Sequence, residues 1–123
     1  MTDTSVSLVG NLTDDLELRV TSSGIARATF RVAVSGRVRD GDGWRDAEPS
    51  FYPVVVWREQ AEHAADSLAR GSRVVVVGRL RQRSWQADDG SARSLVEVAA
   101  EELGPSLRWA TATTTRAASS QGQ

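Results

Sequence analysis

The sequence predicts an all-β fold, a small barrel of five antiparallel strands with one helix, in a single domain. Stretches of alternating apolar and polar residues recur along most of the chain, and short clusters of turn-forming residues separate them. Only one segment has helical character. A length of 123 residues suits one domain built around one core.

The first third of the chain predicts three strands. Residues 6–10 and 16–20 are short apolar or alternating runs, each closed by polar turn residues. Residues 25–35 alternate more clearly, with apolar side chains at the even positions from 26 to 34 and with Arg27 and Arg31 on the other side. This pattern is typical of a half-buried strand, here with a basic outer face.

A segment rich in turn formers precedes the fourth strand. Residues 36–49 contain two Asp-Gly pairs, and we expect them to form a long exposed hairpin loop. Residues 50–57 return as a strand, with Phe51 and Trp57 on one side. Pro53 cannot donate a backbone hydrogen bond, so this strand is expected to be an edge or to bulge there.

The second half predicts the helix and the last strands. Residues 59–70 open with an acid, close with an arginine and stop at Gly71, as helix termini prefer. Residues 74–85 read as a strand, and residues 91–103 as its partner after an Asp-Asp-Gly turn. We expect one domain over residues 1–108 and a short disordered tail over 109–123. The order of elements is that of an OB-fold.

Composition excludes several classes of function. The net charge is −1 and the pI about 5.8, which argues against binding duplex DNA through bulk charge. The absence of cysteine excludes disulfides, thiolate metal sites and a cysteine nucleophile. Neither a signal peptide nor a membrane-spanning run is evident, so we expect a cytoplasmic, nucleoid-associated protein without membrane attachment.

No pattern in the chain predicts catalysis. His63 is the sole histidine and lies within the expected helix, where such a residue is usually at the surface or in packing. The segment 71–78 lacks the lysine and hydroxyl residue of a phosphate-binding loop. We therefore predict that the protein is not an enzyme and has no metal site and no cofactor.

Arginines and aromatic residues instead share the polar side of the strands. All fifteen basic residues are arginine, and codon bias explains this as well as selection does. The candidate nucleic-acid contacts are Phe51, Trp57, Trp85, Trp44, Arg27, Arg31, Arg37, Arg39, Arg79, Arg81 and Arg83. Indoles stack on bases of any identity and guanidinium groups pair with phosphates, so the combination predicts binding of an unpaired strand.

Each aromatic residue also has a purely structural interpretation. Trp57 lies on a strand that is apolar on both sides, so a place in the core is an equal alternative. Trp85 would cap the barrel, Trp44 would pack against another subunit, and Trp109 would pin the C-terminal segment. The arginines would then only solubilise an outer face.

The same segments resemble the bacterial single-stranded DNA-binding protein family. The likeness runs from about residue 5 to 103 and includes LVGNL at 8–12, ARATFRVAVS at 26–35 and the long run 54–85, followed by DDGSAR and VEV. The resemblance implies an OB-fold that assembles as a homotetramer and wraps single-stranded DNA.

The resemblance also assigns roles to particular positions. Phe51 and Trp85 fall where the family has DNA-stacking tryptophans, and Trp57 falls where it has a stacking phenylalanine. The family's hairpin tryptophan falls near Val38, so we expect Trp44 to substitute for it. The family's long tail with an acidic tip has no counterpart here, which implies that protein recruitment through such a tail is absent.

We therefore predict sequence-independent binding and protection of single-stranded DNA in replication, recombination or repair. The alternative is an OB-fold adaptor of replication-restart assemblies, whose exposed aromatics meet protein partners. A weak RNA chaperone is a third possibility, because no feature of the sequence discriminates the 2′-hydroxyl.

Overall fold

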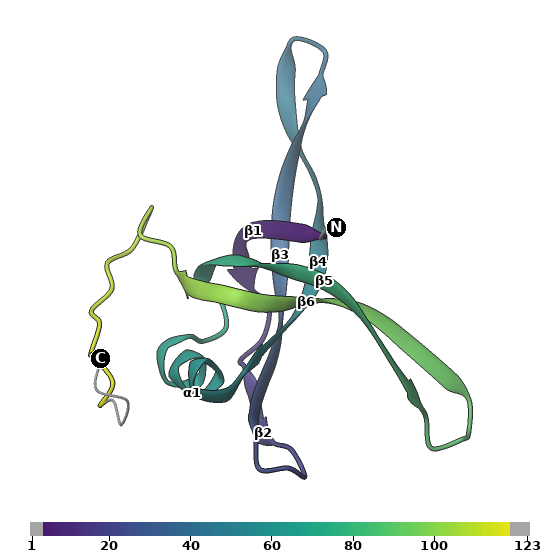
Figure 1. Ribbon diagram of the computed structural model, residues 1–123. Helices are drawn as coiled ribbons and strands as arrows, with labels where there is room; N and C mark the ends of the chain where they lie inside the picture. Colours follow the sequence, from purple (N-terminus) through teal and green to yellow (C-terminus); the bar gives the residue numbers. More distant parts are fainter. Residues whose placement is uncertain (1–3, 119–123) are drawn as a thin grey trace.

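The computed structural model describes residues 4–118 and contains six strands and one helix in that range. The elements are β1 (Ser5–Leu12), β2 (Glu17–Val20), β3 (Ala26–Asp40), β4 (Gly43–Trp57), α1 (Arg58–Ser67), β5 (Arg73–Gln86) and β6 (Ala92–Pro105). Figure 1 shows the helix at one end of the strands and two long hairpins that project from them in different directions.

Five of the strands form a closed ring, which confirms the predicted OB-fold barrel. The sheet order is β1-β5-β6-β4-β3-β2, and an additional β1–β3 pairing closes the ring, while β2 extends the sheet beside β3. All junctions are antiparallel except the one between β4 and β6, which is parallel. Only Val54 and Val55 of β4 take part in that junction, opposite Val98 and Ala99.

The core fills the barrel and extends under the helix. Its buried residues come from every strand of the ring, from α1 and from Leu68 just after the helix: Leu8, Leu12, Ala28, Phe30, Val32, Val54, Val56, Ala61, Ala64, Leu68, Val74, Val76 and Val98. Alternation therefore divides the valine run of β5, because Val74 and Val76 enter the core whereas Val75 and Val77 are exposed.

The helix ends three residues earlier than the sequence predicted. Leu68 is already extended, and its side chain is buried in the core. The following turn is tied to the start of the chain, because the Arg70 N–H donates to Asp15 at 2.8 Å and the Gly71 N–H donates to the Leu12 carbonyl at 2.9 Å. Gly71, with φ of 89°, therefore serves the turn into β5 and does not cap the helix.

The prediction of a hairpin loop over residues 36–49 is wrong, because most of these residues form a two-stranded β-ribbon. Strands β3 and β4 continue their pairing as far as Asp40 opposite Gly43, so only two residues form the tip. The bulge that the sequence allowed at Pro53 is absent from that position. The register shift lies instead between Val34 and Gly36, near Pro49. Pro53 instead lies opposite Arg31, just outside the short pairing of β4 with β6.

Candidate nucleic-acid interface

The outer side of β3 and β4 brings four predicted site residues together. Arg27 lies directly opposite Trp57, and Ala33 lies opposite Phe51, in the antiparallel register. Arg31 lies between them on the same side of β3. We call the surface formed by Arg27, Arg31, Phe51 and Trp57 the stacking face.

Trp57 is a partly exposed platform on this face. Its side chain is half-buried, and the guanidinium carbon of Arg27 lies 5.6 Å from its ring centroid, within cation–π range. Phe51 is 55% exposed. The interpretation of Trp57 as a core residue is therefore wrong, because the neighbouring positions Val54 and Val56 fill the core instead.

The parallel junction joins the stacking face to the arginine row of β5. Thr29 pairs with Val55, Val55 pairs with Ala99, and Ala99 pairs with Arg79, so one row of side chains crosses four strands. Val55 is fully buried although it alternates with the core positions of β4. Val55 is thus buried on the side of the sheet that carries the stacking face and the arginines of β5.

Three arginines of β5 form ion pairs with carboxylates of β6. Arg79 pairs with Glu101 at 3.2 Å, while Arg81 and Arg83 both pair with Glu97, at 3.5 and 3.4 Å. Glu97 is 3% exposed and is the buried charged residue that sequence reasoning missed. Its signal was present, because an acid between Val96 and Val98 falls on the arginine side of the final strand.

A further carboxylate, that of Asp14, pairs with Arg31 of the stacking face. Asp14 accepts hydrogen bonds from the Thr13 hydroxyl at 2.8 Å and from Arg31 at 3.3 Å. These bonds, first that of Thr13 and then that of Arg31, hold the pKa of Asp14 below its ordinary value of 3.8. The guanidinium of Arg31 remains largely exposed, so its other N–H groups are accessible to a ligand.

The β3–β4 arm, residues 36–47, carries Trp44 away from the barrel (Figure 1). Arg39 lies opposite Trp44, and the guanidinium carbons of Arg37 and Arg39 each lie 5.7 Å from its ring centroid. Trp44 is 58% exposed, so it is not packed within this chain. The three side chains form a cluster that is separate from the stacking face.

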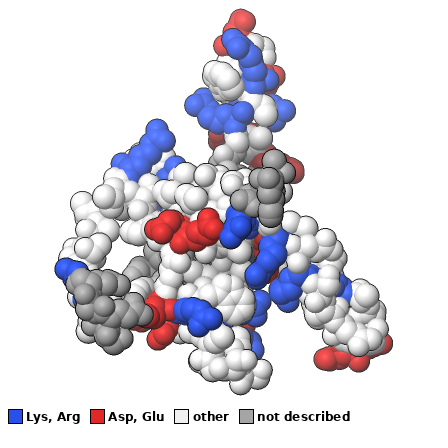
Figure 2. Space-filling view, in the orientation of Figure 1, with Lys and Arg blue, Asp and Glu red and all other residues white. Residues whose placement is uncertain are grey.

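The β5–β6 arm, residues 82–96, carries Trp85 in a similar way. The guanidinium carbon of Arg83 lies 4.5 Å from the ring centroid of Trp85, which is partly exposed and does not seal the barrel. This tryptophan lines an open hollow of about 530 Å³ together with Gln82, Ser84, Gln86, Ala92, Arg93 and Ser94. Figure 2 shows basic side chains along both arms and acidic ones at their tips.

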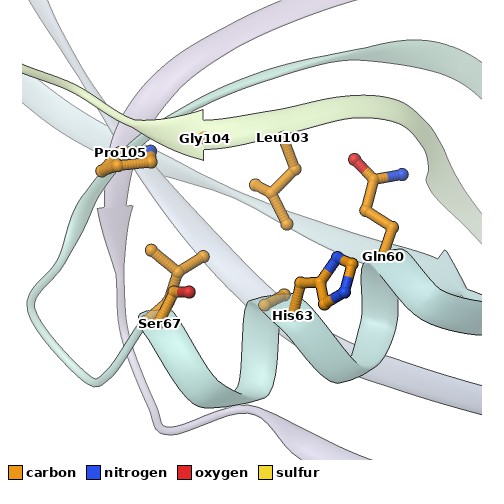
Figure 3. Close-up of a pocket in the computed structure, with 8 residues that line it drawn as sticks. Gln60, His63, Ser67, Leu103, Gly104 and Pro105 are labelled. Atoms are coloured by element: carbon orange, nitrogen blue, oxygen red, sulfur yellow. The ribbon is translucent and has the colours of Figure 1, made fainter. Parts of the chain in front are cut away.

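The pocket beside the helix, of about 220 Å³, contains none of the predicted site residues. His63 and Gln60 of α1 face Leu103 and Pro105 of β6 across it (Figure 3). His63 is exposed, in keeping with its predicted place at the surface. Among residues 4–118 no group of three metal-ligating side chains is present, and no helix is long and apolar enough to cross a membrane.

Comparison with known proteins assigns the chain to a family. The model of the "Single-strand binding protein family" matches residues 3–106. The chain belongs to the single-strand binding protein family. It is 50% identical to the single-stranded DNA-binding protein of Mycobacterium leprae over 98% of this chain and 73% of that one, and 51% identical to that of Mycolicibacterium smegmatis over 96% and 73%.

A solved structure supports the same assignment. The small single-stranded DNA-binding protein from Streptomyces coelicolor superposes with a TM-score of 0.71 and 33% identity, over 87% of this chain and 97% of that one. Membership of a single-strand binding family confirms the recognition from sequence motifs. It also places the chain among binding proteins and not among enzymes, as the sequence predicted.

Within this family member, the predicted contacts form three groups and not one continuous patch. The stacking face and the start of the β5 arginine row are neighbours, whereas Trp44 and Trp85 lie on separate arms. The predicted tail, residues 109–123, falls partly outside the described residues, because 119–123 are not described. Residues 106–118 contain neither helix nor strand.

Proposed function

We propose that the protein binds single-stranded DNA without sequence preference, with bases stacked on Phe51 and Trp57. The pairing of Trp57 with Arg27 at one end of the stacking face carries this proposal. A half-buried indole offers a rigid surface to any base, and a guanidinium beside it can pair with the phosphate of the same nucleotide. The names of the relatives agree with this ligand.

The arginines of β5 are proposed to pair with the backbone of the same strand. Glu97 holds Arg81 through one terminal nitrogen and Arg83 through its Nε. A guanidinium has five N–H donors, so each arginine keeps donors that can reach a phosphate. Glu97 thus fixes the two cations in place and leaves part of their hydrogen-bonding capacity to the ligand.

The two arms are proposed to extend the bound strand beyond the barrel. Trp44 with Arg37 and Arg39, and Trp85 with Arg83, repeat the pairing of an indole with a guanidinium that is found at Trp57. The base would replace the guanidinium on the ring, and the guanidinium would pair with a phosphate. The acidic tips of both arms would repel the backbone and limit the path of the strand.

We also propose the homotetramer that the resemblance implies, assembled in part through the outer side of β1 and β5. Val9 lies opposite Val75, and Val77 follows on the same side; all three are exposed on this chain. An exposed cluster of β-branched residues is favourably covered by a second copy. Light scattering tests this directly, because Val75→Asp should lower the mass and a monomeric wild type would contradict it.

The biological role that follows is protection of single-stranded DNA in replication, recombination or repair in the cytoplasm. Its test is a titration of intrinsic tryptophan fluorescence with oligo(dT). Bases stacked on Trp57, Trp44 and Trp85 should quench the emission strongly. Unchanged emission would contradict stacking and favour the protein-interaction adaptor. A matched RNA oligonucleotide tests the third possibility, a weak RNA chaperone.

Salt dependence tests the role of the arginines separately from stacking. Each phosphate neutralised on a single strand contributes about 0.7 to the slope of log affinity against log salt concentration. The net charge is −1, so long-range attraction is weak and the slope should report local contacts. A slope of zero would exclude pairing between the arginines and phosphates.

A further inference from the structure

We propose that Trp109, together with Arg73 and Arg108, is a further contact for the nucleic-acid strand, remote from the stacking face. This inference rests on the proposed function and extends it to a part of the surface outside the predicted contacts. The site lies where β5 begins and where the C-terminal segment leaves β6. The occupant is the same single strand, in a longer bound path.

The indole of Trp109 is accessible although two guanidinium groups lie against it. The side chain is 70% exposed, more than any other tryptophan of the chain. The guanidinium carbon of Arg73 lies 4.4 Å from the ring centroid, and that of Arg108 lies 4.7 Å from it. Both distances are within the range of a favourable cation–π interaction.

The barrel holds this cluster in place. The Ser106 N–H donates to the Arg73 carbonyl at 2.8 Å, and the Arg108 N–H donates to the Ser106 hydroxyl at 3.3 Å. Arg73 is itself the first residue of β5 and pairs with Asn11 of β1. Trp109 is therefore anchored next to the sheet, although the segment that carries it has no regular structure.

The cluster repeats the arrangement found at each of the other three tryptophans of the chain. Arg27 lies against Trp57, Arg83 lies against Trp85, and Trp44 has two arginines. An exposed indole with a guanidinium beside it provides one surface for a base and one cation for its phosphate. The fourth tryptophan has the same two components.

The arginines at this site lack the carboxylate partners that the arginines further along β5 have. Arg79, Arg81 and Arg83 pair with carboxylates, whereas among the described residues neither Arg73 nor Arg108 has a carboxylate within 4 Å. The Nε of Arg73 is buried without an acceptor in that range of the chain. Two guanidinium groups around one ring thus lack an anion, which a phosphate would supply.

The distance along β5 determines which ligands reach the site. Arg79 lies in the row of side chains that joins β5 to the stacking face, and Arg73 is six residues from it along the strand, which corresponds to about 20 Å at roughly 3.3 Å per residue. An oligonucleotide of about 4 nucleotides, at the short end of the range of about 4 to 16 nucleotides per OB-fold, would occupy the stacking face without reaching Trp109. A strand of about 60 nucleotides would reach it.

The test compares Trp109→Ala with Leu107→Ala on both lengths of end-labelled oligo(dT). Leu107 is a matched control, because it lies on the same segment and is 67% exposed but has no ring on which a base could stack. Trp109→Ala should weaken binding of the long strand about tenfold and leave the short strand unchanged, since stacking on one aromatic residue typically has that effect. Leu107→Ala should change neither affinity.

Arg73→Met provides a second, electrostatic readout. Loss of one phosphate contact should reduce the salt slope for the long strand by about 0.7 and leave that for the short strand intact. Unchanged affinity of Trp109→Ala for the long strand would overturn the inference. A lower mass in light scattering with loss of both affinities would also overturn it and assign Trp109 to a subunit interface. Failure of the wild type to bind either strand would instead refute the proposed function.

Discussion

Removal of Arg81 and Arg83 together should cost more stability than the sum of the two single substitutions. Both arginines pair with Glu97, whose side chain is 3% exposed, whereas their own side chains are 49% and 36% exposed. In each single variant, Arg81→Met or Arg83→Met, Glu97 keeps one cation. The double variant leaves a buried carboxylate without any.

The expected size of the coupling follows from the difference between losing one of two cations and losing both. Losing one long hydrogen bond to a charged group costs about 1 kcal/mol when the other partner remains. A buried charge left unpaired costs about 3 to 5 kcal/mol, and we take about 3 because the two arginine side chains that border Glu97 are themselves 49% and 36% exposed. The coupling free energy between the two positions is therefore about 1 kcal/mol.

Urea denaturation of the wild type, both single variants and the double variant measures this coupling. Equal protein concentrations are needed, because assembly contributes to stability. Adding Glu97→Gln to the double variant removes the unpaired charge and should restore part of the stability. Additivity within about 0.3 kcal/mol would show that Glu97 is not held by both arginines.

Three further predictions concern single positions. Gly78→Ala should destabilise the protein by about 1 to 3 kcal/mol in urea denaturation, because its Cβ would lie 2.2 Å from a backbone oxygen of β6, whereas Gly104→Ala meets nothing and should have little effect. Arg58→Gly should raise the free energy of unfolding by about 0.5 to 1 kcal/mol, because Arg58 has φ of 64°; an unchanged value would contradict this strain. Asp14 should titrate below pH 3.8 when followed by NMR. Its contribution to stability is therefore present above that pH and is lost as the pH falls through the lowered pKa. Arg31→Met should raise the pKa of Asp14 only in part, because the hydrogen bond from Thr13 remains.

Local pattern predicted the barrel well, because each strand is buried on one side. Alternation from residue 26 to 34 gave the core side of β3, and the division of the valines of β5 follows the same rule. The β3–β4 arm was not predicted as strand, because both of its sides are solvated and no apolar side distinguishes it from a loop. Its regularity comes from cross-strand pairs such as Arg39 with Trp44.

The site was predictable residue by residue but not in its arrangement. The outward arginines were found from alternation, yet their carboxylate partners lie 14 to 22 residues away in sequence and depend on the register of β5 with β6. The parallel junction that joins the stacking face to β5 depends on barrel closure. The contact between Arg73 and Trp109 likewise requires the end of β6 to return to the start of β5.

The affinity of Trp57→Ala for a short labelled oligo(dT), measured by fluorescence anisotropy, tests the central claim most directly. Stacking of one base on an aromatic side chain contributes about 1 to 3 kcal/mol, a range measured on single-strand binding proteins of this class and adopted from them, so affinity should fall about 5- to 150-fold. Trp57→Phe should retain most of the affinity, because the ring still stacks and the core residues beside it are unchanged. Equal affinity of Trp57→Ala and the wild type would contradict the assignment of the stacking face as the surface that binds bases.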